Sequence, residues 1–124
     1  MGYLIDTHIL LYALADPQKL TAKQRTILED SNNVIHVSIA SIWETYIKKS
    51  LGKLEFDFDI EAKLSEMNIQ LLNISVSDCQ LMASLPSHHK DPFDRMIIAS
   101  SINESLKVVS NDGEFKHYDI KLVA

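Results

Sequence analysis

Short apolar stretches alternate with amphipathic segments along the chain. Residues 3–5, 34–37, 69–74 and 106–109 are apolar-rich and predict strands, and residues 120–123 predict a last edge strand. Helix-capping residues and helical spacing mark the segments between them, at residues 7–14, 21–30, 38–51, 59–67, 75–85 and 91–102. This alternation is typical of an α/β domain, in which helices cover both faces of a largely parallel sheet.

The clearest predicted helix begins after Ser38, a good N-cap residue, and ends at Gly52, the residue type preferred just past a helix. Its apolar positions recur at helical spacing, at Ile39, Ile42, Trp43, Tyr46, Ile47 and Leu51. Another helix opens at Asp91, a cap residue, with Pro92 at its first position. Its expected buried stripe is Phe93, Met96, Ile97, Ala99 and Ile102.

The composition fits a single domain that spans residues 1–124. A chain of 124 residues with 46% hydrophobic content can bury a core without disulfides. The single cysteine, Cys79, has no disulfide partner, and we expect it to lie with Met82 in the core. A charge at Asp6 comes too early for a signal peptide, and no apolar run approaches the ~20 residues of a membrane span. We therefore expect a cytoplasmic protein without membrane contact.

The formal net charge of -5 argues against a protein that binds nucleic acid through a broad basic face. Any such binding would need positive charge from another source, and bound divalent cations could supply it. Six basic residues are candidates for phosphate contacts: Lys48, Lys49, Lys53, Lys90, Arg95 and Lys116. Each is equally well explained as a solvated surface charge.

Four acidic residues fall where an α/β fold can bring them to one edge of the sheet. Asp6 and Asp112 each follow a predicted strand. Asp94 lies in the first turn of a predicted helix, and Glu44 lies on the helix after the second strand. Ligands of parallel sheets bind beyond the carboxyl ends of the strands. Crowded carboxylates raise one another's pKa unless a cation compensates, and oxygen ligands select hard ions such as Mg²⁺ or Mn²⁺.

Each of these acids also has an ordinary structural explanation. Asp6 could cap the helix that follows it, and Asp94 suits the positive end of a helix dipole. Glu44 stands one turn before Lys48 and could form a surface ion pair. Asp112 occupies a common turn sequence. The four acids therefore become informative only as a set.

Four stretches of the sequence carry a resemblance to a known family. They are YLIDTH at residues 3–8, SIASIWE at 38–44, HKDPFDRMIIA at 89–99 and VVSNDGEF at 108–115. In their order, and over nearly the whole chain, they resemble the four motifs of PIN-domain ribonucleases. The resemblance is closest to the VapC-type toxins of bacterial toxin-antitoxin pairs, and HKDPFDR is the most specific block.

The resemblance implies a PIN-like three-layer domain, with a central, mostly parallel sheet flanked by helices, and often a homodimer. It implies an RNA substrate, a cognate antitoxin as partner, and a pocket for one or two Mg²⁺ or Mn²⁺ ions. The hydroxyl of Ser110 would help to order that pocket. The implied metal ligands, which are also the catalytic residues, are Asp6, Glu44, Asp94 and Asp112. The expected reaction is cleavage of single-stranded RNA by a metal-activated water.

Other polar residues near this set have simpler explanations. Asp91 stands before Pro92 and fits a helix cap better than a metal ligand. His8, His88 and His89 flank the acids, but a histidine near a helix start more often packs or caps. We therefore keep these histidines outside the predicted site.

Two other function classes share an acidic pocket at a sheet edge. A non-catalytic metal- or phosphate-responsive interaction domain, similar to a receiver domain, usually has paired acids after its first strand, whereas Asp6 stands alone. A DNA-directed nuclease of the flap type shares the acids but is usually larger. Incubation with single-stranded RNA and DNA separates the three classes.

Overall fold

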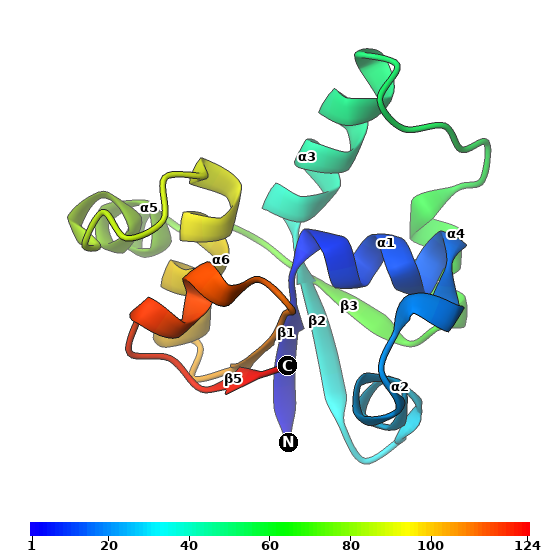
Figure 1. Ribbon diagram of the computed structural model, residues 1–124, viewed down its shortest axis with the longest axis horizontal. Helices are drawn as coiled ribbons and strands as arrows, with labels where there is room; N and C mark the ends of the chain where they lie inside the picture. Colours follow the sequence, from blue (N-terminus) through cyan, green and yellow to red (C-terminus); the bar gives the residue numbers. More distant parts are fainter.

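A five-stranded sheet, parallel throughout, forms the centre of the protein (Figure 1). The computed structural model describes all 124 residues. The strand order is β3-β2-β1-β4-β5. The strands are β1 (Gly2–Ile5), β2 (Val34–Ser38), β3 (Ile69–Leu72), β4 (Lys107–Val109) and β5 (Leu122–Val123). The predicted strands and their parallel arrangement are therefore confirmed.

The strand order places β1 in the middle of the sheet. From β1 the chain proceeds to β2 and β3 on one side, and it then crosses to β4 and β5 on the other side. Such a reversal makes the connections diverge at the carboxyl ends of two adjacent strands, which is where ligands bind in open α/β sheets. This switch point lies between β1 and β4, where Ile5 pairs with Val109.

Helices cover both faces of the sheet, as the alternating pattern predicts. They are α1 (Thr7–Ala15), α2 (Ala22–Glu29), α3 (Ile39–Ser50), α4 (Ile60–Glu66), α5 (Val76–Ser84) and α6 (Pro92–Asn103), with the short 3-10 helices η1 (Pro17–Lys19) and η2 (Gly113–His117). In Figure 1, α1, α2 and α4 lie on one side of the sheet and α5 and α6 on the other. Successive residues of β1 point to opposite faces, so Ile5 joins a core of 14 buried residues and Leu4 a second core of 6.

The helices begin at the capping residues that the sequence predicts. Ser38 caps α3 by accepting a hydrogen bond from the backbone N–H of Ala40, and Asp91 caps α6 ahead of Pro92. α3 ends just before Gly52, whose φ of 73° is a left-handed conformation that glycine adopts at little cost. None of the helices has the length and apolar character that a membrane crossing requires.

The apolar stripe of α3 is largely exposed. Trp43 is 63% exposed and Leu51 62% exposed. The residues that α3 buries are small or polar, namely Ala40, Ser41, Glu44 and Thr45. In α6, Phe93 is only half-buried and Ile102 is 40% exposed, whereas the rest of the predicted stripe is buried as expected. The spacing therefore predicts both helices correctly but not the whole of their buried faces, because α3 turns Ser41 and Glu44 toward Thr7 of α1 and leaves Trp43 outside, where it meets Phe93 of α6.

The predicted core position of Cys79 is wrong, because Cys79 is exposed and Met82 is only half-buried. The buried residue of α5 is instead Asp78, which is 2% exposed. Its carboxylate accepts hydrogen bonds from the hydroxyl of Ser100 at 3.0 Å and from the amide of Asn103 at 2.7 Å, both on α6. α5 is thus attached to α6 through polar contacts.

We expect Asp78→Ala to lower the free energy of unfolding by about 2–3 kcal/mol, because it removes the acceptor of several charge-assisted hydrogen bonds. Burial alone would raise the pKa of Asp78, but hydrogen bonds from Asn103, Ser75 and Ser100 outweigh it and lower the pKa. The effect of the substitution should therefore shrink as the pH falls below 3.8 and Asp78 becomes protonated.

Urea unfolding at neutral pH measures this loss. The matched control is Cys79→Ala at the exposed neighbouring position, which should change the free energy of unfolding by less than about 0.5 kcal/mol. Equal losses in the two variants would contradict the role assigned to Asp78.

Candidate metal centre

The four predicted site residues come from separate elements that meet beyond the carboxyl ends of β1 and β4. Asp6 directly follows β1, and Asp112 lies between β4 and η2. Glu44 comes from α3, and Asp94 comes from the first turn of α6. We call these four residues the acidic cluster. Its position coincides with the switch point of the sheet.

Asp6 is both the N-cap of α1 and a member of the acidic cluster. Its Oδ1 accepts a hydrogen bond from the backbone N–H of Ile9 at 2.8 Å, and the hydroxyl of Ser110 donates to its Oδ2. Burial raises the pKa of Asp6; both hydrogen bonds oppose this shift, whereas the charge of Asp112 adds to it. The cap and the ordering contact from Ser110 therefore act on the same carboxylate.

Glu44 is buried on the inner side of α3, at 8% exposure, although it also forms the ion pair with Lys48. Lys48 Nζ lies 3.4 Å from Glu44 Oε2. The other oxygen, Oε1, accepts a hydrogen bond from the hydroxyl of Thr7 at 2.7 Å. The ion pair with Lys48 therefore engages only one oxygen of Glu44, and the charge of Glu44 still raises the pKa of Asp94 in the acidic cluster. Sequence reasoning assigns no role to Thr7, although its place directly after Asp6 is the signal that points to it.

Asp94 has the most strongly perturbed carboxyl group of the cluster, with a pKa raised to about 7. Burial is the main cause, and the negative charge of Asp91 is the next. The charges of Asp6 and Glu44 raise the pKa further, while His89 acts in the opposite direction. Negative charge from several elements therefore accumulates at Asp94, and a bound cation would relieve it.

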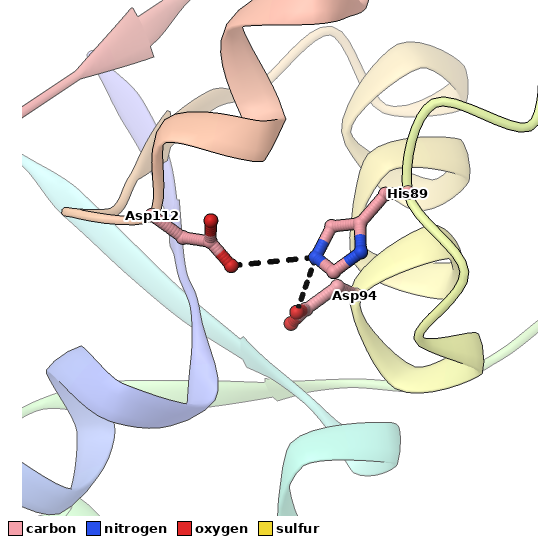
Figure 2. A group of neighbouring side chains, drawn as sticks. All are labelled: His89, Asp94 and Asp112. Carbon is pink, nitrogen blue, oxygen red and sulfur yellow. Dashed lines mark hydrogen bonds and ion pairs between the residues drawn. The ribbon is translucent and has the colours of Figure 1, made fainter.

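His89 lies between two members of the acidic cluster (Figure 2). Its Nε2 lies 2.8 Å from Oδ2 of Asp94 and 3.3 Å from Oδ2 of Asp112. One nitrogen or oxygen atom from each of these three side chains lies within 4.8 Å of the others. Sequence reasoning leaves His89 outside the site, although its position at the head of the HKDPFDR block is a signal that points to it.

Asp112 is held by the start of η2. Its Oδ1 accepts a hydrogen bond from the backbone N–H of Glu114 at 2.9 Å, so this acid also caps a helix. The backbone N–H of Asp112 donates to the hydroxyl oxygen of Ser110 at 3.0 Å. Ser110 therefore connects the residue that follows β1 with the turn that follows β4.

The loop that carries His89 is fixed by Arg95, and this corrects the candidate role of Arg95 in phosphate binding. The guanidinium donates to four main-chain carbonyls at 2.7–3.2 Å, those of Met82, Leu85, Pro86 and His89. The hydroxyl of Tyr118 also donates to the Pro86 carbonyl at 2.7 Å and accepts the backbone N–H of His89 at 2.8 Å. Arg95 therefore holds the HKDPFDR block in place.

A pair of aromatic side chains, the exposed Trp43 and the half-buried Phe93, adjoins the acidic cluster in sequence. The rings of Trp43 and Phe93 meet edge to face with centroids 5.4 Å apart, and each residue directly precedes an acid of the cluster.

Of the lysines considered for phosphate contacts, Lys49 has its Nζ over the ring of Phe56, 4.2 Å from the ring centroid. Three others are exposed, namely Lys53, Lys90 and Lys116.

The donor set of the acidic cluster fits a hard divalent cation. Carboxylate oxygens are the ligands that Mg²⁺ and Mn²⁺ prefer, and every carboxylate here already has an oriented conformation. Burial raises the pKa of both Asp6 and Asp94, which a nearby divalent charge would reverse. A cavity of about 590 Å³ lies elsewhere, at the amino ends of β2 and β3, and its lining includes no member of the cluster.

Comparison with solved structures supports this fold. VapBC2 of Rickettsia felis, bound to a promoter DNA fragment, is 20% identical with a TM-score of 0.74, and the match covers 99% of this chain and 98% of that chain. DNA-bound VapBC of Salmonella typhimurium is 17% identical, with coverage of 99% and 97% and a TM-score of 0.68. FitAcB of Neisseria gonorrhoeae is 18% identical, with coverage of 98% and 96% and a TM-score of 0.62.

Sequence comparison gives the family. No curated protein matches the chain. The sequence profile described as "PIN domain", however, matches residues 3–121, which include all four acids and the strands β1 to β4 except Gly2. On the basis of this match over nearly its full length, the chain belongs to the PIN domain family.

Proposed function

We propose that this protein is a metal-dependent ribonuclease and the toxin of a toxin-antitoxin pair. The observation that carries the proposal is the convergence of the acidic cluster at the switch point of the sheet, with the pKa of Asp94 raised to about 7. PIN domains are generally nucleases that use divalent metal, and this acidic cluster suits such an ion. A crowded group of buried carboxylates is costly to stability, so its presence favours a function.

In this proposal the acidic cluster holds Mg²⁺ or Mn²⁺. The main ion would be held by Asp6, Asp94 and Asp112, and Glu44 with a shared carboxylate would hold a second. The bound ions would acidify a water molecule and neutralise charge on the attacking and leaving oxygens. Ser110 and Thr7 orient the carboxylates beside them before substrate arrives. The water oxygen bonds to phosphorus as the bond to the leaving oxygen breaks, without a covalent intermediate on the protein.

The surface beside the cluster supports a single-stranded substrate. Unpaired bases stack on exposed aromatic side chains, and Trp43, 63% exposed and backed by Phe93, offers one next to Glu44. The exposed Lys90, directly after His89 in the sequence, adds positive charge to a chain whose net charge is -5. RNA rather than DNA is the substrate that we infer from the resemblance to VapC-type toxins.

The structural matches support the proposed partners. The matched structures from Rickettsia felis and Salmonella typhimurium are VapBC complexes, and a further match is a toxin-antitoxin complex from Klebsiella pneumoniae. We therefore propose a cognate antitoxin, whose arginine could pair with two carboxylate oxygens of the cluster at once.

We also propose that residues 1–124 act as one domain, that the protein forms a homodimer, and that it acts in the cytoplasm, where its RNA substrate lies.

We expect Asp94→Asn to lower the rate of RNA cleavage by orders of magnitude, because it keeps the shape of the side chain but removes a charge that binds metal. Purified protein with Mg²⁺ or Mn²⁺ is incubated with single-stranded RNA and, in parallel, with single-stranded DNA of the same sequence. Chelator should stop the reaction. The control is Asp119→Asn at an exposed position outside the cluster.

Undiminished cleavage by Asp94→Asn would refute the assigned chemistry. Cleavage of DNA in preference to RNA would instead favour the flap-type nuclease. Metal binding without cleavage of either substrate would favour the non-catalytic interaction domain.

We also expect the metal-free protein to lose stability as the pH rises. Asp94 binds its proton more tightly in the folded protein, with a pKa of about 7, than in the unfolded chain, where the reference value is 3.8. The stabilising contribution of the protonated group is therefore complete below 3.8 and is lost as the pH rises to about 7. In chelator at pH 8, Asp94→Asn should consequently melt at the same temperature as the wild type or higher.

Added Mn²⁺ should reverse this order. It should stabilise the wild type by about 2.7 kcal/mol at a hundredfold excess over its Kd, and the variant by much less. If Asp94→Asn melts clearly below the wild type in chelator and keeps the full response to Mn²⁺, Asp94 is a structural residue and not a ligand.

Expression of the wild-type protein alone should arrest bacterial growth, because unopposed RNA cleavage stops protein synthesis. Asp94→Asn, expressed to the same level, should leave growth intact, and co-expression of the cognate antitoxin should relieve the arrest by the wild type. Growth rate and protein level are measured together. Normal growth in the presence of folded, active wild-type nuclease would refute the toxin role but not the nuclease activity.

A further inference from the structure

Every carboxylate of the acidic cluster is held by a donor from the protein. The Ser110 hydroxyl donates to Asp6, and the Thr7 hydroxyl donates to Glu44. The remaining two acids, Asp94 and Asp112, belong to different elements, and the one side chain that contacts both is His89 (Figure 2). The role of His89 therefore depends on whether its Nε2 carries a hydrogen or offers a lone pair to a metal.

The other ring nitrogen of His89 decides this question. The backbone N–H of Asp91 donates a hydrogen bond to Nδ1 at 3.4 Å. A ring nitrogen that accepts an N–H carries no hydrogen of its own, so the neutral imidazole has its hydrogen on Nε2. That N–H then donates to Oδ2 of Asp94 at 2.8 Å, and Oδ2 of Asp112 lies 3.3 Å from the same nitrogen.

A histidine that binds a metal shows the opposite arrangement. Its ligating nitrogen has no hydrogen, and its second nitrogen donates an N–H to a carbonyl or a carboxylate. In His89 the second nitrogen faces a donor instead of an acceptor. Ligation through Nε2 would place a hydrogen on Nδ1, directly opposite the N–H of Asp91.

The ring of His89 is also fixed in place. Its backbone N–H donates to the hydroxyl of Tyr118 at 2.8 Å, and its carbonyl accepts a hydrogen bond from Arg95 at 3.2 Å. The ring packs edge to face on Phe115, with centroids 5.9 Å apart, and only 13% of the side chain is exposed. Because these three contacts fix the position of His89, its Nε2 can fix the positions of the carboxylates that it contacts.

We propose that His89 is a positioning residue of the metal centre and not a metal ligand. Its Nε2–H donates to one oxygen of Asp94, and the same nitrogen contacts one oxygen of Asp112 at 3.3 Å, so that the first turn of α6 and the turn after β4 hold their carboxylates at a fixed separation. Oδ1 of Asp94 and the free lone pairs of the Asp112 carboxylate are then left for the ion. This inference rests on the proposed function, because it concerns how the same carboxylates bind their metal.

The test compares Mn²⁺ binding by the wild type and three variants. His89→Phe keeps a planar ring without a donor, and His89→Gln restores an N–H near the position of Nε2. His117→Phe is the control, because His117 is an exposed histidine on η2 that has no contact with the acids. Electron paramagnetic resonance measures free Mn²⁺ for the affinity, and its pulsed form detects a nitrogen bound directly to Mn²⁺.

We expect His89→Phe to weaken Mn²⁺ binding by about 10- to 100-fold, as is typical for the loss of a group that orients metal ligands. His89→Gln should recover most of the affinity, and His117→Phe should bind like the wild type. The wild type should show no coupling to a bound imidazole nitrogen. Such a coupling that disappears in His89→Gln, or wild-type affinity in His89→Phe, would overturn the proposal.

A metal-free measurement separates this inference from the proposed function. Nitrogen chemical shifts of the ¹⁵N-labelled histidine rings report which ring nitrogen carries the hydrogen, and the signal missing from His89→Gln identifies His89. We expect the neutral ring to carry its hydrogen on Nε2, whereas a neutral ring with its hydrogen on Nδ1 would overturn the positioning role. A wild-type protein that binds no Mn²⁺ would refute the proposed metal chemistry, and the ring shifts would still decide the state of His89.

Discussion

Buried negative charge at the carboxyl ends of β1 and β4 is the constraint on which the site depends. Carboxylates that leave water stay charged only where donors or cations face them. The fold meets this need with backbone N–H groups at helix starts, as for Asp6 and Asp112, and with hydroxyls such as that of Thr7. These donors only partly offset burial, since the pKa of Asp6 and of Asp94 remains raised.

Capping and metal binding are therefore compatible roles of one side chain. β1 ends at Ile5 and α1 begins at Thr7, so a single residue connects the strand to the helix. That residue, Asp6, must cap the helix and must also lie at the edge of the sheet. One of its oxygens accepts the N–H of Ile9 and the other accepts the hydroxyl of Ser110, and both oxygens keep lone pairs for an ion.

The sequence predicts the strands, the helix caps and the placement of the acids because these depend on local chemistry. Ser38, Gly52 and Asp91 act within one turn of their own helix, and their roles are confirmed. The prediction fails for Cys79, because its exposure depends on how α5 packs against α6.

The role of Asp78 in joining those two helices depends on Ser100 and Asn103, which lie far along the chain. For His89 the sequence offers a signal, its place five residues before Asp94 in the HKDPFDR block, but not the contact with Asp112. The sheet brings Asp112 to it, and no spacing rule describes that meeting.

The attachment of Arg95 makes the metal centre depend on a weakly buried helix. Its guanidinium connects the end of α5 to the loop of His89, and α5 itself buries one residue. Elements with few buried contacts open locally at a smaller free-energy cost than the whole fold. When α5 detaches, Arg95 loses the carbonyls of Met82 and Leu85, whereas Tyr118 still holds the backbone of His89. The support of the metal centre is therefore divided between a helix that opens at low cost and an aromatic hydroxyl that stays with the sheet core.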